Sequence, residues 1–372
     1  MTTARRLSDP DADPFASTYR EARRKFVDSA AAARATLASY PHPLSGKDGE
    51  ALAIDVAVDG APEAQALLLL TSGCHGVEGF AGSGVQVAAL RDDALRAHAS
   101  ARGIALVHVH ALNPYGFSHL RRATHENVDL NRNFRDFSQP LPQNDGYRAL
   151  HPLLVPARWP PDEENTTALM QAVAARGPRA FQAAVTGGQH QFADGLFFGG
   201  TQPCWSNLAL RRILRSHAAA AKRIGWIDLH SGLGPAGVGE RILACTGVAA
   251  VERARRWWGE HVTSIEDDTA VSAAVSGPIW TAVPDECPHA EYTGIALEFG
   301  TLPPLQVLHA LRGEAWLRTN PQAAPGLAER IGREAFGAFF VDSAEWRAGV
   351  LRQAREAIIQ AIDGLAGSTP EV

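Results

Sequence analysis

The chain of 372 residues lacks any apolar run that approaches the roughly 18 residues a membrane-spanning helix needs. It also lacks a long basic run, and its formal net charge is −5. This charge disfavours nucleic acid and anionic lipid as main partners. The first segment, Met1 to Pro14, is polar and acidic rather than basic and then apolar, so we expect no secretory signal and a cytoplasmic location.

Cysteine is scarce as well, with four residues and no C-x-x-C spacing. This pattern fits reduced thiols better than a disulfide framework. Only Cys74 stands beside residues that could carry chemistry. A thiolate paired with the next residue, His75, is a conceivable nucleophile. Adjacent residues in an extended turn point apart, however, so we disfavour this interpretation.

Hydrophobic residues make up 45% of the chain and charged residues 20%, which is typical of a globular protein with a sizeable core. We find no internal repeat and no linker long enough to separate independent units, so we expect a single domain over residues 1–372. The segment 15–40 is rich in helix formers and free of glycine until Pro41, which predicts an N-terminal helix there. Residues 51–58 alternate in polarity, which predicts an edge strand.

Short apolar runs predict the buried strands of a sheet. They are Ala66 to Leu70, Ile104 to His110, Ile224 to Leu229 and Gly294 to Leu297. Such continuous apolar runs are typical of strands covered on both faces. Strands that alternate with helices imply an α/β fold, with a mostly parallel mixed sheet flanked by helices.

The stretch T-S-G-C-H-G-V-E-G, residues 71–79, concentrates metal-binding groups in a glycine-rich turn after a buried strand. His75 and Glu78 are three positions apart, so both can face the same way if the turn enters a helix. Imidazole and carboxylate are ordinary ligands for Zn²⁺. Taken alone, an H-x-x-E pair is more often part of an ordinary loop.

Two further residues follow other predicted strands in the same way. His230 comes directly after one buried strand, and Glu298 lies near the end of another. Ligands gather at the carboxyl edge of a parallel sheet, so these side chains should meet His75 and Glu78 there. Two His and one Glu would leave a fourth position of zinc open for water, the pattern of a catalytic site. Glu298 would then be left over as a base.

A rival site is possible at His108 and His110, which lie on one face of a predicted strand. H-x-H is a legitimate zinc spacing, but a strand histidine is more often a core residue. The segment 113–134 carries three arginines and several polar residues on a loop after a strand, where binding residues are expected. For Arg121 or Arg122 taken separately, a solvated surface ion pair is the simpler interpretation.

Five motifs together resemble a known family. H-G-V-E, N-P-Y-G-F, D-L-N-R-N-F, I-D-L-H and L-E-F-G occur in this order between Ser72 and Thr301. The sequence is similar to the zinc carboxypeptidases related to carboxypeptidase A, including the deacylase branch with aspartoacylase and succinylglutamate desuccinylase. It looks most like an uncharacterised bacterial branch of that superfamily. The resemblance implies a three-layer sandwich of the zinc-carboxypeptidase (phosphorylase/hydrolase-like) type.

The resemblance also implies roles for individual residues. One Zn²⁺ ion would be held by His75, Glu78 and His230, and Asp129 would orient the first histidine. Glu298 would be the general base. The substrate's terminal carboxylate would be held by Asn131 and Arg132. An arginine upstream of D-L-N-R would polarise the scissile carbonyl; Arg121 and Arg122 both qualify, and we prefer Arg122.

The sequence departs from the family pattern in two places. The stretch between Glu78 and His230 is longer than the resemblance leads us to expect, which predicts an insertion at residues 138–205. The tyrosine that digestive members use over the substrate has no secure counterpart, because Tyr292 sits close to Glu298 and can simply begin the strand.

The residues and the resemblance together predict a zinc-dependent hydrolase that cleaves an amide bond next to a free carboxylate, as a metallocarboxypeptidase does. The substrate would be a peptide or, as an alternative with the same machinery, an N-acyl amino acid. A non-catalytic zinc or peptide-binding module is a second alternative. It has no need of a base, so Glu298 argues against it. The sequence does not indicate the oligomeric state or the side-chain specificity.

Overall fold

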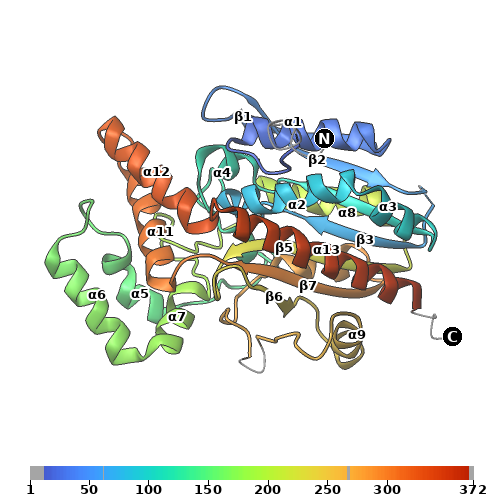
Figure 1. The fold of residues 1–372 in the computed structure, drawn as a ribbon. Helices are drawn as coiled ribbons and strands as arrows, with labels where there is room; N and C mark the ends of the chain where they lie inside the picture. The colour runs from blue at the N-terminus through green and yellow to red at the C-terminus, as the bar shows by residue number, and fades with distance from the viewer. Residues whose placement is uncertain (1–11, 62, 266–268, 368–372) are drawn as a thin grey trace.

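The computed structural model describes residues 12–61, 63–265 and 269–367. Within these residues the centre of the fold is a seven-stranded sheet with the order β1-β2-β4-β3-β5-β7-β6, shown in Figure 1. The strands are β1 (Thr36–Ser45), β2 (Ala51–Asp59), β3 (Ala66–Thr71), β4 (Ile104–His110), β5 (Arg223–Gly232), β6 (Gly239–Leu243) and β7 (Glu291–Gly300).

The four central strands, β4, β3, β5 and β7, run parallel to one another. The outer pairs β1–β2, β2–β4 and β6–β7 are antiparallel. All six residues of β3, A-L-L-L-L-T, are buried because the strand has a neighbour on each side and helices over both faces. The predicted mixed α/β sheet is therefore confirmed, with its parallel part in the middle.

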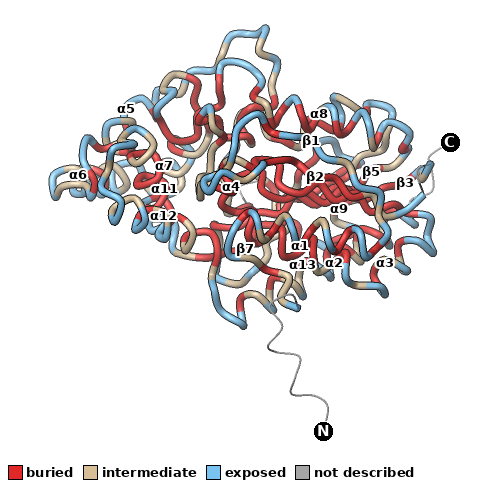
Figure 2. Tube along the Cα trace, turned by 90° about the horizontal axis from the view of Figure 1, so that it is seen from above, coloured by how far each residue is buried: buried red, intermediate tan, exposed pale blue. Residues whose placement is uncertain are grey.

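Helices cover both faces of the sheet. On one side lie α1, α2, α3 and α13, and on the other lies α8 (Figure 2), with α10 packed beside it. Buried residues concentrate in the strands between these two layers (Figure 2). The helices are α1 (Tyr19–Ala32), α2 (Gly79–Arg91), α3 (Asp93–Ser100), α4 (Pro114–His119), α5 (Asp145–Leu154), α6 (Glu163–Arg176), α7 (Pro178–Thr186), α8 (Trp205–His217), α9 (Val248–Trp258), α10 (Ala282–Glu286), α11 (Pro304–Thr319), α12 (Pro325–Phe339) and α13 (Ala344–Gly367), with 3₁₀ turns η1 (Gly76–Glu78), η2 (Leu130–Arg132) and η3 (Ile279–Thr281).

The helices α5, α6 and α7 lie beside the sheet rather than on it, at the left of Figure 1 near α11 and α12. A hydrophobic cluster of their own, which includes Tyr147, Leu150 and Phe181, packs against Leu308 and Leu311 of α11. These three helices all lie within residues 138–205. The origin of the segment as an insertion stays a prediction.

The predicted helix over 15–40 is too long. The observed helix begins after Thr18, whose side chain accepts a hydrogen bond from the Glu21 backbone N–H. It ends before Arg34, which has a left-handed φ of 60°. Residues 36–45 instead form β1. For residues 36–40, pairing with β2 outweighs the helix preference of the side chains. For the same reason residues 51–58 are not an edge strand, since β1 covers that edge.

The helix α2 follows η1 directly. A Cβ on Gly82 would lie 2.6 Å from the Cβ of Ser72. The glycine therefore allows the helix to lie close to the chain that leaves β3. Within the described residues, no helix has both the length and the apolar character required to cross a membrane.

Candidate metal centre

The first part of the site is the turn that leaves β3. The backbone N–H of Gly76 donates to the carbonyl oxygen of Arg122 at 3.1 Å, and that of Val77 donates to Arg121 at 2.9 Å. A Cβ at position 76 would lie 2.1 Å from the carbonyl carbon of Gly116. Glycine is thus required here because two backbone segments touch. This contact fixes the direction in which His75 and Glu78 leave the turn.

His75, Glu78 and His230 converge on one point. The Nδ1 atom of His75 lies 2.8 Å from Glu78 Oε1, and the Nδ1 atom of His230 lies 3.0 Å from Glu78 Oε2. All three side chains are buried. One donor atom from each residue lies within 4.8 Å of the others. The tertiary structure therefore brings His230 to His75 and Glu78, which are distant from it in sequence.

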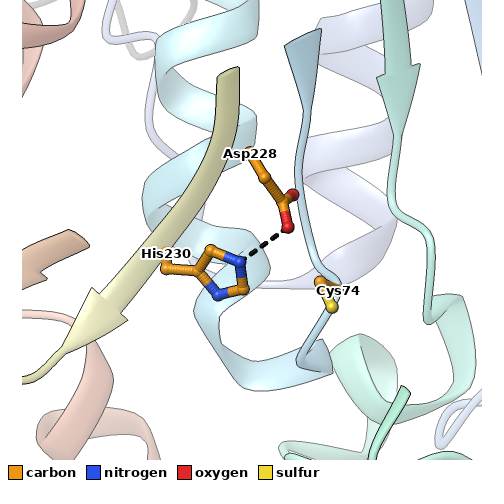
Figure 3. Close-up of side chains that lie close together, drawn as sticks. All are labelled: Cys74, Asp228 and His230. Carbon is orange, nitrogen blue, oxygen red and sulfur yellow. Dashed lines mark hydrogen bonds and ion pairs between the residues drawn. The ribbon is translucent and has the colours of Figure 1, made fainter. Parts of the chain in front are cut away.

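The opposite ring nitrogen of each histidine faces a second carboxylate. His75 Nε2 lies 3.2 Å from Asp129 Oδ1, and His230 Nε2 lies 2.7 Å from Asp228 Oδ2. Figure 3 shows the Asp228–His230 contact within one strand. A carboxylate at Nε2 favours a proton on that nitrogen, so Nδ1, which is directed at the common point, is the nitrogen that would bind a metal ion.

Asp228 is the residue that the sequence analysis missed. Its Oδ1 accepts a hydrogen bond from Thr71 Oγ1, which in turn accepts one from Trp226 Nε1 at 2.7 Å. The signal was present in the motif I-D-L-H, because residues 228 and 230 alternate onto the same face of a strand. Burial lowers the pKa of His230, but the Asp228 carboxylate outweighs this effect, and the net pKa is well above its usual value.

Cys74 forms a second possible grouping with Asp228 and His230, whose donor atoms also lie within 4.8 Å of one another (Figure 3). Asp228 is already engaged by Thr71 and His230. Burial, followed by the charge of Asp228, raises the pKa of the Cys74 thiol well above its usual value. The thiol is therefore protonated, which speaks against both a thiolate ligand and a thiolate nucleophile.

The structure shows which of the two neighbouring arginines lies at the donor set, a choice that their spacing in the sequence left open. Arg122 points into the site, where its Nε donates to Asp129 Oδ2 at 2.9 Å and its Nη1 to Glu78 Oε1 at 3.1 Å. Its Nη2 lies 2.7 Å from His75 Nε2. Arg121 points away, with its Nε 3.7 Å from Glu314 Oε1. Of the two, Arg122 is the guanidinium at the donor set.

Asp129 connects the first histidine to the segment that follows. Besides His75 and Arg122, it accepts a hydrogen bond from the backbone N–H of Asn131 at 3.0 Å. Burial by itself raises the pKa of Asp129, but the guanidinium groups of Arg122 and Arg132 lower it well below its usual value. The carboxylate is thus ionised and able to orient His75.

Arg132 and Asn131 lie close by, but their side chains already have hydrogen-bond partners within the protein. Arg132 is 4% exposed. Its Nε donates to the carbonyl oxygen of Thr186 at 2.9 Å, and its Nη1 donates to the oxygen of Asn131 at 2.8 Å. The Asn131 side chain accepts from the backbone N–H of Ile279 at 2.9 Å. The ring of Phe197 covers both Arg122 and Arg132, at 5.0 and 5.7 Å from the two guanidinium carbons. A substrate carboxylate can reach Arg132 only by exchanging with one of these partners.

Glu298 lies on β7 directly beside His230 on β5. Its Oε1 accepts a hydrogen bond from the backbone N–H of Leu233 at 3.0 Å. Burial, and next the negative charge of Glu78, raise the pKa of Glu298 to about 7. A carboxylate with a pKa near 7 can accept and return a proton at neutral pH, as a general base must. Glu78 itself has a lowered pKa, because the two histidines outweigh the effect of burial.

The donor set fits a zinc ion by its chemistry. Two imidazole nitrogens and one carboxylate are ordinary zinc ligands, and each histidine has the outer carboxylate that metal-bound histidines usually have. Ser231 donates its backbone N–H to Glu78 Oε2 at 3.3 Å, which further fixes the carboxylate. The residues present could therefore hold Zn²⁺ through His75, Glu78 and His230.

The rival pair on β4 lies elsewhere. His108 and His110 are completely buried. The ring of Phe26, from α1, stacks on His110. Neither ring nitrogen of His108 has a hydrogen-bond partner among the described residues, and His110 Nε2 lies 2.9 Å from Ser83 Oγ. Burial lowers the pKa of both to about 4. No third ligand joins them in the described part of the chain, so they are core residues.

Fold and site together define an α/β protein with a buried His–Glu–His donor set at the carboxyl edge of its parallel strands. Residues 15–353 match the sequence signature of one family, described as "Protein of unknown function (DUF2817)". The chain belongs to this family. No curated protein sequence matches the chain.

Several solved structures are similar to this chain. Carboxypeptidase A from Helicoverpa armigera has 14% identity and a TM-score of 0.42, over 87% of this chain and 74% of that one. Thrombin activatable fibrinolysis inhibitor has 11% identity and a TM-score of 0.43, over 87% and 83%. The murein-tripeptide amidase MpaA from Escherichia coli O157 has 15% identity and a TM-score of 0.35, over 75% and 91%. The chemistry of the present site rests on its own residues.

Proposed function

We propose that this protein is a zinc-dependent hydrolase that cleaves an amide bond next to a free carboxylate. The observation that carries the proposal is the position of Glu298. A carboxylate with a pKa raised to about 7 lies beside a buried set of two histidines and one glutamate. A non-catalytic binding module would need the three ligands but not this fourth acidic group.

Each residue of the site has a role in this proposal. Zn²⁺ held by His75, Glu78 and His230 would supply Lewis-acid chemistry and lower the pKa of a bound water from 15.7 to about 7. Glu298 takes a proton from the attacking water and later returns it to the leaving amine. Arg122 supplies positive charge for the developing oxyanion, an effect worth roughly 3 to 4 kcal/mol for one well-placed donor.

Arg132 and Asn131 are the proposed clamp for the substrate carboxylate. A guanidinium offers a planar pair of donors that matches a carboxylate. In the present arrangement the donors of Arg132 are satisfied by backbone carbonyls of Asn131 and Thr186. Binding would therefore exchange a neutral acceptor for a charged one, which strengthens the hydrogen bond.

The first experiment is metal analysis of protein purified without added metal and then reconstituted with Zn²⁺. We expect about one zinc ion per chain, retained in His108→Ala and lost in His75→Ala. Protein that binds no zinc even after reconstitution would disprove the proposal. Loss of zinc from His108→Ala with retention in His75→Ala would assign the metal to β4 instead.

The second experiment identifies the substrate class. Wild-type protein is compared on C-terminally free peptides, on the same peptides amidated at the C-terminus, and on N-acyl amino acids. We expect activity only where a free carboxylate lies next to the scissile amide. Preference for N-acyl amino acids would assign the protein to the deacylases. Equal turnover of free and amidated peptides would remove Arg132 and Asn131 from their proposed role.

A further inference from the structure

A buried carboxylate on α11 takes no part in the chemistry proposed above. The side chain of Glu314 is 9% exposed, and its Oε1 has no hydrogen-bond partner among the described residues. The nearest guanidinium nitrogen recorded for it, Arg121 Nε, is 3.7 Å away, which is too far for a hydrogen bond. A buried acidic oxygen normally has a donor. This oxygen can therefore accept a hydrogen bond from a donor that contacts other groups in the present structure.

A small cavity connects Glu314 to the metal centre. Its lining includes Glu314, Arg122 and Asp129, together with Phe197 and Leu311. Its volume of about 10 Å³ leaves room for about one water molecule. Arg122 and Glu314 thus line the same small space, which has room for about one water molecule.

Arg122 cannot keep all of its present contacts once a metal ion is bound. Its Nη1 donates to Glu78 Oε1, an oxygen of the carboxylate that a cation would use. Its Nη2 lies 2.7 Å from His75 Nε2 and can donate only if that nitrogen is unprotonated. Metal at His75 Nδ1 requires the proton on Nε2, facing Asp129. Two positive charges would also compete for Glu78. The Nη2 contact is therefore incompatible with a cation at His75 Nδ1, and the Nη1 contact competes with a cation for the Glu78 carboxylate.

We infer that Glu314 is a positioning residue for Arg122. When a divalent cation occupies the donor set, the guanidinium releases Glu78 and His75, keeps Asp129 through Nε, and turns its Nη atoms toward Glu314 Oε1, directly or through one water. Glu314 thereby holds Arg122 beside the metal rather than in its place. From there the guanidinium can act on the substrate oxygen. This inference rests on the proposed zinc site.

The test is the equilibrium affinity of the metal-free protein for Zn²⁺, measured by competition with a chelating dye. We expect Glu314→Gln to bind Zn²⁺ about tenfold more weakly, because the neutral amide oxygen is a weaker acceptor than the carboxylate and Arg122 then stays on the charged Glu78. Arg122→Ala should bind Zn²⁺ more tightly than wild type, because a competing positive charge is gone. In the double variant, Glu314→Gln should have no further effect.

The controls separate this inference from a role in stability. Glu334→Gln removes a half-exposed carboxylate from α12 and should leave the Zn²⁺ affinity unchanged. The variant Arg121→Gln tests whether Glu314 acts through Arg121 rather than through Arg122. This variant should bind Zn²⁺ with the affinity of wild type. Chemical unfolding of the metal-free variants records any loss of stability separately from affinity.

Two results would overturn the inference. One is a Glu314→Gln variant that binds Zn²⁺ as wild type does. The other is a loss of affinity that is equally large in the Arg122→Ala background, since the effect would then not pass through Arg122. If wild-type protein binds Zn²⁺ and Glu314→Gln binds it equally well, the proposed zinc site stands and the proposed role of Glu314 is disproved. If wild type binds no Zn²⁺, both fall.

Discussion

His230 on β5 and Glu298 on β7 are direct partners in the register of two parallel strands. Partners in register project to the same side of a sheet, so the second histidine of the donor set and the candidate base are placed next to each other by backbone pairing. A shift of one residue would send one of the two side chains to the opposite face. The geometry of the site therefore depends on the register of the sheet as well as on local turns.

Replacement of Glu298 by glutamine should strongly reduce turnover without loss of metal. The amide has a similar shape but cannot take a proton, and general base catalysis typically contributes about 10² to 10⁴-fold. We expect kcat to fall by that range while the zinc content stays near that of wild type. Glu291→Gln is the matched control, because it makes the same change at the other end of β7. Equal activity of wild type and Glu298→Gln would remove Glu298 from its role.

Replacement of Asp228 by asparagine should weaken metal binding. The carboxylate lies 2.7 Å from His230 Nε2 and keeps the proton on that nitrogen, and such outer partners typically contribute about 10- to 100-fold to metal affinity. Calorimetric titration with Zn²⁺ measures the change. Asp285→Asn, a half-exposed residue in α10, serves as the control and should bind as wild type does. Unchanged affinity of Asp228→Asn would show that the contact does not orient the ligand.

Replacement of Gly76 by alanine should disturb the site through the backbone. The added Cβ would meet the backbone of residue 116 at 2.1 Å, and backbone atoms cannot move aside as a flexible side chain can. We expect a loss of about 1 to 3 kcal/mol in the free energy of unfolding, together with weaker Zn²⁺ binding. Gly337→Ala in α12, where nothing lies within 4 Å of the new Cβ, should retain both properties. Denaturant unfolding and Zn²⁺ titration of the two variants decide the point.

The buried histidines of β4 should make the protein sensitive to acid. The pKa of His108 and that of His110 are lowered to about 4 in the folded state, against about 6.5 when exposed. Between these values the unfolded chain binds more protons, so stability falls as the pH drops from 6.5 toward 4. Each histidine can contribute up to about 3 kcal/mol to this loss.

The measurement is the free energy of unfolding of the metal-free protein at a series of pH values. In His108→Leu the decline between pH 6.5 and 4 should be shallower than in wild type, because one of the two groups no longer titrates. His261→Leu, at an exposed position after α9, should leave the slope unchanged. If the free energy of unfolding of His108→Leu falls with pH as steeply as that of wild type, the pKa of His108 is not lowered in the folded state.

The sequence predicted the parts of the fold whose signal is local. The apolar runs of β3, β4, β5 and β7 identify buried strands, because a strand covered on both faces has no polar side to show. The segment 36–40 was assigned wrongly, since its residues favour a helix and only pairing with β2 makes them a strand. Such pairing joins distant parts of the chain and leaves no local pattern.

For the site, the sequence by itself determined the chemical groups. It supplied His75, Glu78, His230 and Glu298 at the ends of apolar runs, and the order of parallel strands was enough to expect them at one edge. Only the tertiary structure decided which neighbouring side chains act on them. It selected Arg122 over Arg121, it placed Asp228 behind His230, and it brought Glu314 from α11 to the same cavity as Arg122. The physical reason is that the direction of a side chain depends on packing between segments far apart in sequence, whereas the type of a side chain is fixed at its own position.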